Sequence, residues 1–378
     1  MFKYLSLVFL VLFFSTKMLA SITDANDLEG KIAEAKQTRK KCWLKDKTKE
    51  LSYLEKEYHI EMALSAWSMG QYDVQSTLKT LGGSVDYALK YMPTTQNIFG
   101  LKLEAQESFS SLNSTQFYQD LGSLNVTSAH FEDVNPYFKE LWFERKFESF
   151  RFRLGVINPD SFMDRSFYNN FTKYFMSQSN SAKSYALLPS SSFALVGSYA
   201  KKNFYMNALL CDGNAQSGEA IQNVKDEKMA LYSSVELGFT PKKNKYYLNI
   251  WSKQTNAYSV QNNKDSLGAF ISLNQDLDRK DKVFFKYGAS KNTQIRQHMS
   301  LGLGHHELFS KKDLFLSSMD FSQSDETSKF QTSVEFVYKY VYENLELSVD
   351  LQVIDNLIHS KEDKNFALLP GLRVRALF

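Results

Sequence analysis

The chain has 378 residues, with 45 basic and 42 acidic side chains and a mean hydropathy of −0.37. A charge this close to neutral gives no electrostatic basis for nucleic acid or an anionic membrane surface as a partner. Two cysteines, Cys42 and Cys211, and six histidines are too few and too scattered to indicate a disulfide framework or a zinc site. We therefore expect no metal and no other cofactor, and leave open whether the two thiols are free.

The first twenty residues have the features of an export signal. Lys3 gives a positive start, residues 4–14 form an apolar run, and Ala20 places a small residue before Ser21. A run of about eleven residues is too short to cross about 30 Å of hydrocarbon as a helix. We expect residues 1–20 to be a signal peptide that is cleaved after export.

Residues 21–57 are predicted to be a helical segment ahead of the main fold. Lys31 to Glu50 is rich in basic residues, while Leu28, Ile32 and Ala35 share one helical face. Two interpretations stay open for this segment. It is either a solvated periplasmic helix or a partial plug of a pore.

From residue 58 onward the sequence alternates between apolar and polar residues with period two, which is typical of strands with one apolar face. The clearest example sets Leu345, Leu347 and Val349 against Glu346 and Ser348. Aromatics make up 15% of the chain, as such strands require, and the polar face keeps the mean hydropathy low. Sixteen segments carry this pattern: about 58–65, 84–91, 99–106, 137–147, 150–157, 193–200, 203–211, 229–239, 245–252, 265–275, 282–289, 297–305, 313–321, 329–340, 345–354 and 366–378.

The connections between these segments alternate in length. Every second one is short, for example 92–96, 148–149 and 240–244, whereas 107–136 and 158–192 are long. Short turns at one end and long loops at the other are characteristic of outer-membrane barrels. Residues 58–378 are therefore predicted to form a closed antiparallel up-and-down β-barrel of about sixteen strands, an all-β membrane protein in contact with outer-membrane lipid.

The last segment supports this prediction. Phe366, Leu368, Leu372, Val374 and Phe378 lie on one face, and the sequence ends on the aromatic residue. This pattern resembles the C-terminal signal that barrel proteins present to the barrel-assembly machinery, which we expect as a partner.

Several motifs resemble the carbohydrate-selective porin (OprB-type) family. They are ELWFE at 140–144, RLGVINPDSFMD at 153–164, YNN at 168–170, FM at 175–176, LPSS at 188–191 and GLRVRALF at 371–378. The resemblance implies a Gram-negative outer-membrane porin that lets mono- or oligosaccharides and small solutes diffuse passively. It also implies that residues 158–192 fold into the barrel as a constriction loop. A monomer and a homotrimer are both left open.

Candidate pore-lining residues follow from strand parity. Glu140, Trp142 and Glu144 fall on the polar side of the fourth strand, and Arg151 and Arg153 on that of the fifth. Charged groups and aromatic rings suit hydroxyls and flat sugar faces. The alternative is that these residues are structural ion pairs of the wall. Weaker candidates lie in the loop: Asp160, Asp164 and Arg165.

Two other functions remain open. A lipid hydrolase would use His298 and Ser300 as base and nucleophile, but parity places both on the inner face, away from lipid. We therefore do not expect an enzyme. A barrel with a plugged lumen, serving structure or adhesion, is the third interpretation.

Overall fold

The computed structural model describes residues 28–39, 45–128, 133–180, 185–216, 218–226, 228–257, 259, 264–358, 360 and 364–378. The predicted signal peptide at 1–20 and Cys42 lie outside these residues.

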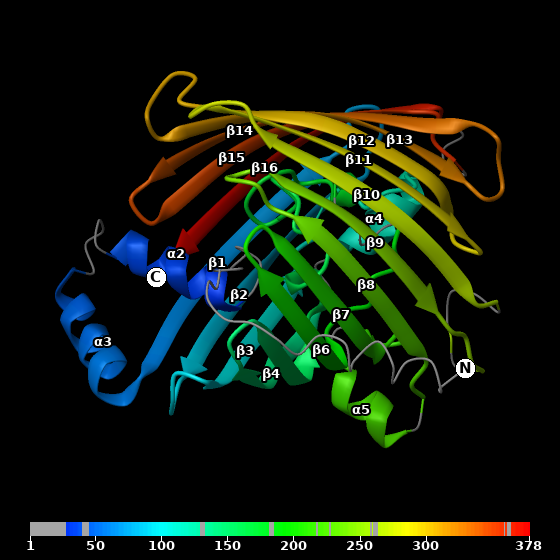
Figure 1. Ribbon diagram of the computed structural model, residues 1–378. Coiled ribbons are helices and arrows are strands. Elements are labelled where there is room, and N and C mark those ends of the chain that lie inside the picture. Colours follow the sequence, from blue (N-terminus) through cyan, green and yellow to red (C-terminus); the bar gives the residue numbers. More distant parts are fainter. Residues whose placement is uncertain are drawn as a thin grey trace.

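Sixteen antiparallel strands follow one another around a closed barrel, in which the first strand pairs with the last (Figure 1). The predicted fold class is confirmed. In chain order the strands are β1 Ile60–Tyr72, β2 Lys79–Tyr91, β3 Asn97–Ser108, β4 Val134–Lys146, β5 Phe150–Ile157, β6 Ser192–Lys201, β7 Phe204–Asp212, β8 Leu231–Phe239, β9 Lys245–Lys253, β10 Ser266–Asp276, β11 Asp281–Lys291, β12 Ile295–His306, β13 Asp313–Ser324, β14 Phe330–Tyr342, β15 Leu345–Asp355 and β16 Phe366–Leu377.

The helices of the described residues are short and are not part of the sheet. They are α2 Leu28–Arg39, α3 Lys45–Tyr58, α4 Ser114–Leu121 and α5 Ala220–Lys225, with single 3-10 turns η1 Pro159–Ser161 and η2 Gln178–Asn180. Among the described residues, none of the helices has the length and apolarity needed to cross a membrane.

The two faces of the strands differ as the alternation predicts. In β15, Leu347 and Val349 are 47% and 53% exposed on the outer face, whereas Asp350 and Gln352 are buried inside. Aromatic rings gather on the outer face near the short turns, where Tyr91, Phe99 and Phe143 lie in series. An apolar outer surface with aromatic residues at its rim is what a membrane-spanning barrel presents to lipid.

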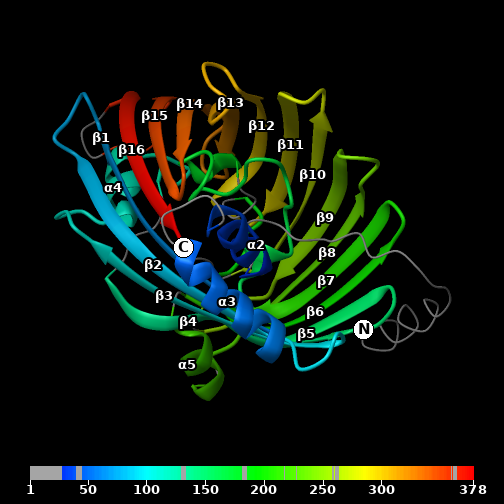
Figure 2. The ribbon, with the colours of Figure 1, turned by 90° about the vertical axis from the view of Figure 1, so that its left-hand side faces the viewer.

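The long connections come together at one end of the barrel and the short turns at the other. Residues 109–133 and 158–191 are the longest connections, and both turn back into the barrel. At the short-turn end, α2 lies within the mouth and α3 crosses its rim (Figure 2). Segments of the chain therefore enter the barrel from both ends, and their positions determine which inward-facing side chains are covered.

The seam between β1 and β16 can be tested by a cross-link. Leu64 and Phe378 exchange both backbone hydrogen bonds, at 2.9 and 2.8 Å, so the adjacent Ser65 and Leu377 form a non-hydrogen-bonded pair with close side chains. We expect Ser65→Cys with Leu377→Cys, in a chain whose native cysteines are replaced by alanine, to form a disulfide on mild oxidation. The resulting ring should migrate faster than the reduced chain on a denaturing gel.

The matched control pairs Ser65→Cys with Ser348→Cys. Ser348 also faces inward but lies on β15, two strands from β1, and is level with Met69 and not with Ser65. The two side chains are therefore more than about 9.6 Å apart, the separation that two strand spacings alone would give. Equal cross-linking in both variants would contradict the seam.

Candidate functional site: the charged interior of the barrel

The loop at 158–191 crosses the interior from wall to wall. It leaves β5 and contacts β7 through the Phe162 carbonyl, which accepts from Asn207 Nδ2 at 2.9 Å. It then reaches β14, where the Met176 amide donates to Glu335 Oε1 at 2.5 Å. On β16, Arg373 donates to two further loop carbonyls at 2.6 and 2.7 Å. The loop predicted to fold into the lumen does so.

Asp164 is the main charged anchor of this loop. Its carboxylate lies 2.9 Å from Lys286 Nζ and accepts from the Tyr247 hydroxyl at 2.5 Å, while its amide donates to Glu236 at 2.8 Å. Asp164 and Lys286 are both almost fully buried. Since a buried charge is costly unless it is paired and hydrogen-bonded, this group of contacts fixes the loop to β8, β9 and β11.

A stack of charged and aromatic groups lies where the loop leaves the wall. Arg153 donates to Glu144 Oε2 through Nε at 3.0 Å and Nη2 at 2.8 Å. Its guanidinium carbon lies 3.5 Å from the centroid of the Trp142 ring and 4.6 Å from that of Phe162. Cation–π contacts and two hydrogen bonds to one carboxylate oxygen thus hold Arg153 between the wall and the loop.

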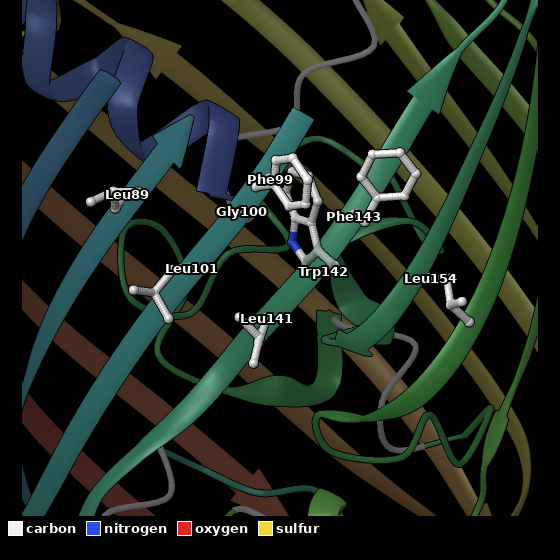
Figure 3. Close-up of a pocket in the computed structure, with 8 residues that line it drawn as sticks. All are labelled: Leu89, Phe99, Gly100, Leu101, Leu141, Trp142, Phe143 and Leu154. Atoms are coloured by element: carbon white, nitrogen blue, oxygen red, sulfur yellow. The ribbon is translucent and has the colours of Figure 1, made fainter. Parts of the chain in front are cut away.

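The Trp142 ring also lies against Gly100 of β3. A Cβ at Gly100 would come within 2.3 Å of the indole, so a glycine is required for this close packing. Gly100 and the Trp142 indole line a hollow together with residues of β2 to β5 (Figure 3). All its lining residues are apolar, as expected of a surface that faces lipid.

The remaining predicted residues lie nearby with different partners. Glu140 accepts from Trp142 Nε1 at 2.8 Å and lies 3.5 Å from the Ser161 hydroxyl. Arg151 was expected to face the β4 carboxylates, but the register places it opposite Lys146. Its Nη1 lies 4.0 Å from Glu29 on α2. Only Arg153 makes the expected ion pair with β4.

The two other loop candidates are not part of this stack. Asp160 belongs to η1 and is half-buried, and the Arg165 carbonyl accepts from Lys245 Nζ at 3.2 Å. Whether any of the eight candidates lines a path for solute stays a prediction.

The helix α2 is held in the mouth by ion pairs of alternating sign. Glu29 lies 3.3 Å from Lys90, Lys31 pairs with Asp86, and Lys36 lies 2.6 Å from Glu61. Glu34 contacts Arg375 at 2.9 Å and Lys173 at 2.7 Å. The apolar face of α2, formed by Leu28, Ile32 and Ala35, is fully buried.

Burial would by itself raise the pKa of the Glu29 carboxyl. Four cationic side chains around it, Arg153 foremost, instead lower that pKa from 4.5 to about 2. Arg375 and Lys173 lower the pKa of Glu34 in the same way, against the opposing effect of its burial. Both carboxylates are therefore charged at neutral pH, and the docked helix stabilises that charge.

Most inward-facing side chains of the described strands are buried. Lys286, Asn207, His298 and Gln352 all show 0% exposure, although none lies in an apolar core. The loop at 158–191 contacts the first three of these residues, and Gln352 donates to the Thr127 carbonyl, in the segment that follows α4, at 2.9 Å. In this conformation, segments of the chain therefore fill most of the space around these inward-facing side chains.

The hydrolase candidates lie within this filled interior. His298 and Ser300 are both fully buried on the inner face, and His298 Nδ1 lies 2.8 Å from the Ser322 hydroxyl. The imidazole also stacks on the Tyr185 ring, with 4.6 Å between the centroids. The structure thus places these two residues away from the lipid-facing surface.

Parity could have identified more of the interior charges than those singled out from the sequence. Asp86, Glu236, Lys286, Arg373 and Arg375 all fall on inward positions of predicted strands. Partners on adjacent strands, such as Lys102 for Asp86 and Glu346 for Arg375, could be inferred in the same way. The partners in the loop and in α2 could not, because they lie far away in sequence.

No family model and no curated protein sequence matches this chain. Solved structures do match. The high-pH structure of Pseudomonas putida OprB gives a TM-score of 0.72 at 12% identity, over 89% of this chain and 97% of that one. The low-pH structure of the same protein gives 0.53 at 14% identity, over 97% and 100%. A substituted porin of Rh. blastica gives 0.58 at 10% identity, over 84% and 100%. Identities this low show a shared barrel fold.

Acid should release α2. A carboxyl whose pKa is lowered on docking contributes stability above its undocked pKa, and this contribution is lost as the pH falls through the docked value. For Glu29 that window runs from about 4.5 to about 2. We expect a thiol introduced by Ala35→Cys, with Cys42→Ala, to be unreactive to dithiodipyridine at neutral pH and to become reactive within this window.

Cys211 is the internal control for that measurement. It is buried inside the barrel at β7, so it should stay unreactive while the barrel is intact. If both thiols react together, the barrel has opened and the separate release of α2 is refuted.

Proposed function

We propose that the protein is an outer-membrane porin for passive diffusion of small solutes, with carbohydrates as the preferred class. The observation that carries this proposal is the loop at 158–191, which crosses a sixteen-strand barrel and brings Phe162 onto the Arg153–Trp142 pair. A constriction that combines ring faces with fixed charges offers a sugar both stacking surfaces and hydrogen-bond partners.

Three further points support this proposal. The apolar outer face with aromatic residues near the short turns fits a membrane. The barrel fold is shared with the OprB of Pseudomonas putida. The sequence motifs at 140–144 and 153–164 resemble carbohydrate-selective porins. Export by a cleaved signal peptide, insertion by the barrel-assembly machinery and a homotrimeric state are parts of the same proposal.

A second candidate function rests on the burial of the interior. Inward side chains such as Lys286 and Asn207 are fully covered, which also suits a plugged barrel with a structural or adhesive role. The two functions differ in one measurable property, since a porin conducts ions across a planar bilayer and a permanently plugged barrel does not.

The test replaces Arg151 and Arg153 together by alanine. If they serve a sugar site, block of the ion current by sugar should weaken, because each lost charge-assisted hydrogen bond contributes about 1.5–3 kcal/mol at the dry limit. Selectivity should also shift towards cations, since Glu144 and Glu29 remain without these partners. The measurement is single-channel conductance with reversal potentials and sugar titration.

Arg145→Ala is the matched control. Arg145 is exposed at the end of β4, where it lies over the Phe147 ring. A drop in thermal stability of the double variant, with selectivity and sugar block unchanged, would instead make these arginines structural. Wild-type protein that assembles but never conducts would favour the plugged barrel.

A further inference from the structure

Two basic clusters inside the barrel are filled by carboxylates of the chain itself. The first surrounds Glu29 and consists of Lys90, Lys146 and Arg151, at 3.3, 3.9 and 4.0 Å. These residues come from β2, β4 and β5, so three strands converge on one carboxylate of α2.

The second cluster surrounds Glu34. Arg375 of β16 binds this carboxylate with both terminal nitrogens, at 2.9 and 3.2 Å, and Lys173 of the loop lies at 2.7 Å. Arg375 also contacts Glu346 at 3.1 Å, and Lys339 lies 3.7 Å from that same carboxylate. A bidentate guanidinium beside an ammonium is the arrangement that proteins use for carboxylate and phosphate groups.

The charges that α2 meets are mainly positive. Its own charged residues form ion pairs with five basic side chains of the strands and loop, but with only two acidic ones, Asp86 and Glu61. The basic five are Lys90, Lys146, Arg151, Lys173 and Arg375. If α2 moved out, the basic residues of the two clusters would keep only carboxylates of the wall as partners, namely Glu61, Glu144 and Glu346 at 3.2, 3.7 and 3.1 Å.

The helix α2 also has features that allow it to be displaced from the mouth of the barrel. It has twelve residues, and isolated helices of that length are marginal in water, so α2 depends on its contacts for order. Its apolar contacts are limited to Leu28, Ile32 and Ala35. Much of its attachment is ionic, and another anion of suitable shape can replace the contacts of Glu29 and Glu34, whereas the Lys31–Asp86 and Lys36–Glu61 pairs break when the helix leaves.

We propose that α2 is a displaceable plug whose Glu29 and Glu34 carboxylates occupy a binding site for acidic saccharides carrying two anionic groups. This inference rests on the proposed porin function and names its substrate class. Residues 29 and 34 are five positions apart, about 7.5 Å along a helix axis, and a short acidic oligosaccharide spans such a distance. An entering dianion would take over both clusters as the helix withdraws.

The test uses the full chain with Glu29→Gln and Glu34→Gln, which keeps the shape of α2 and removes both carboxylates. The probes are trigalacturonate and, as a neutral sugar of equal length, maltotriose. In planar bilayers we expect trigalacturonate to block the variant at a concentration at least tenfold lower than wild type, because it no longer competes with the helix. Block by maltotriose should change less than about twofold, and the reversal potential should move towards anions.

Glu50→Gln with Glu57→Gln is the matched control, since both residues are exposed on α3. It should behave as wild type. Heat-modifiable gel mobility checks assembly, and Glu34→Gln alone serves as a second variant should the double variant fail to assemble.

The outcomes separate the two proposals. If the channels conduct and maltotriose blocks them, but the variant gains no preference for trigalacturonate, the acidic-saccharide site is refuted and the porin stands. An equal gain in the α3 control refutes it as well. If no assembled protein conducts, the porin proposal fails. Equilibrium dialysis of trigalacturonate with detergent-solubilised protein then tests the site, and unchanged affinity in the variant overturns it.

Discussion

The requirement that every backbone N–H and C=O be paired in hydrocarbon governs this molecule. Sixteen strands meet it by closing β1 onto β16, which leaves no open edge. Closure has a second consequence. Because strand side chains alternate, an apolar outer face sends every other residue inward, and in this sequence many of those residues are charged, amide or hydroxyl side chains. The wall therefore carries many charged groups on its inner face, whatever loop enters the barrel.

Those charges account for what fills the barrel. A charge covered by protein is tolerated when it is paired and hydrogen-bonded, and the wall alone does not supply all the partners. Lys286 finds Asp164 in the loop, and Arg375 finds Glu34 on α2. The loop and α2 thus supply the opposite charges that the strands lack. Their placement follows from the same alternation of side chains that puts charged residues on the inner face of the strands.

The sequence predicts the strands better than it predicts which side chains form ion pairs inside the barrel. Period-two alternation locates all sixteen strands. The prediction is least complete for β1, because the predicted segment ends at about residue 65 whereas the strand continues to Tyr72. There the pattern reverses, with Trp67 and Met69 facing inward against the loop and small residues facing out. Glu144 and Arg153 could be paired from parity because their strands are adjacent. Arg151 could not, since periodicity gives the face of a residue but not the distant segment that covers it.

In the proposed scheme, the ion pairs of α2 connect closure of the pore with the choice of solute. A neutral sugar that displaced the helix would leave Lys90, Lys173 and Arg375 with less compensating charge in a confined space, at a cost in desolvation. A solute with two carboxylates replaces Glu29 and Glu34 at these cations, while Asp86 and Glu61 lose their contacts with Lys31 and Lys36. Under the proposed scheme the charges that hold the plug in place also favour an anion as the solute that displaces it. Selectivity then arises at the moment of opening and does not require a separate filter.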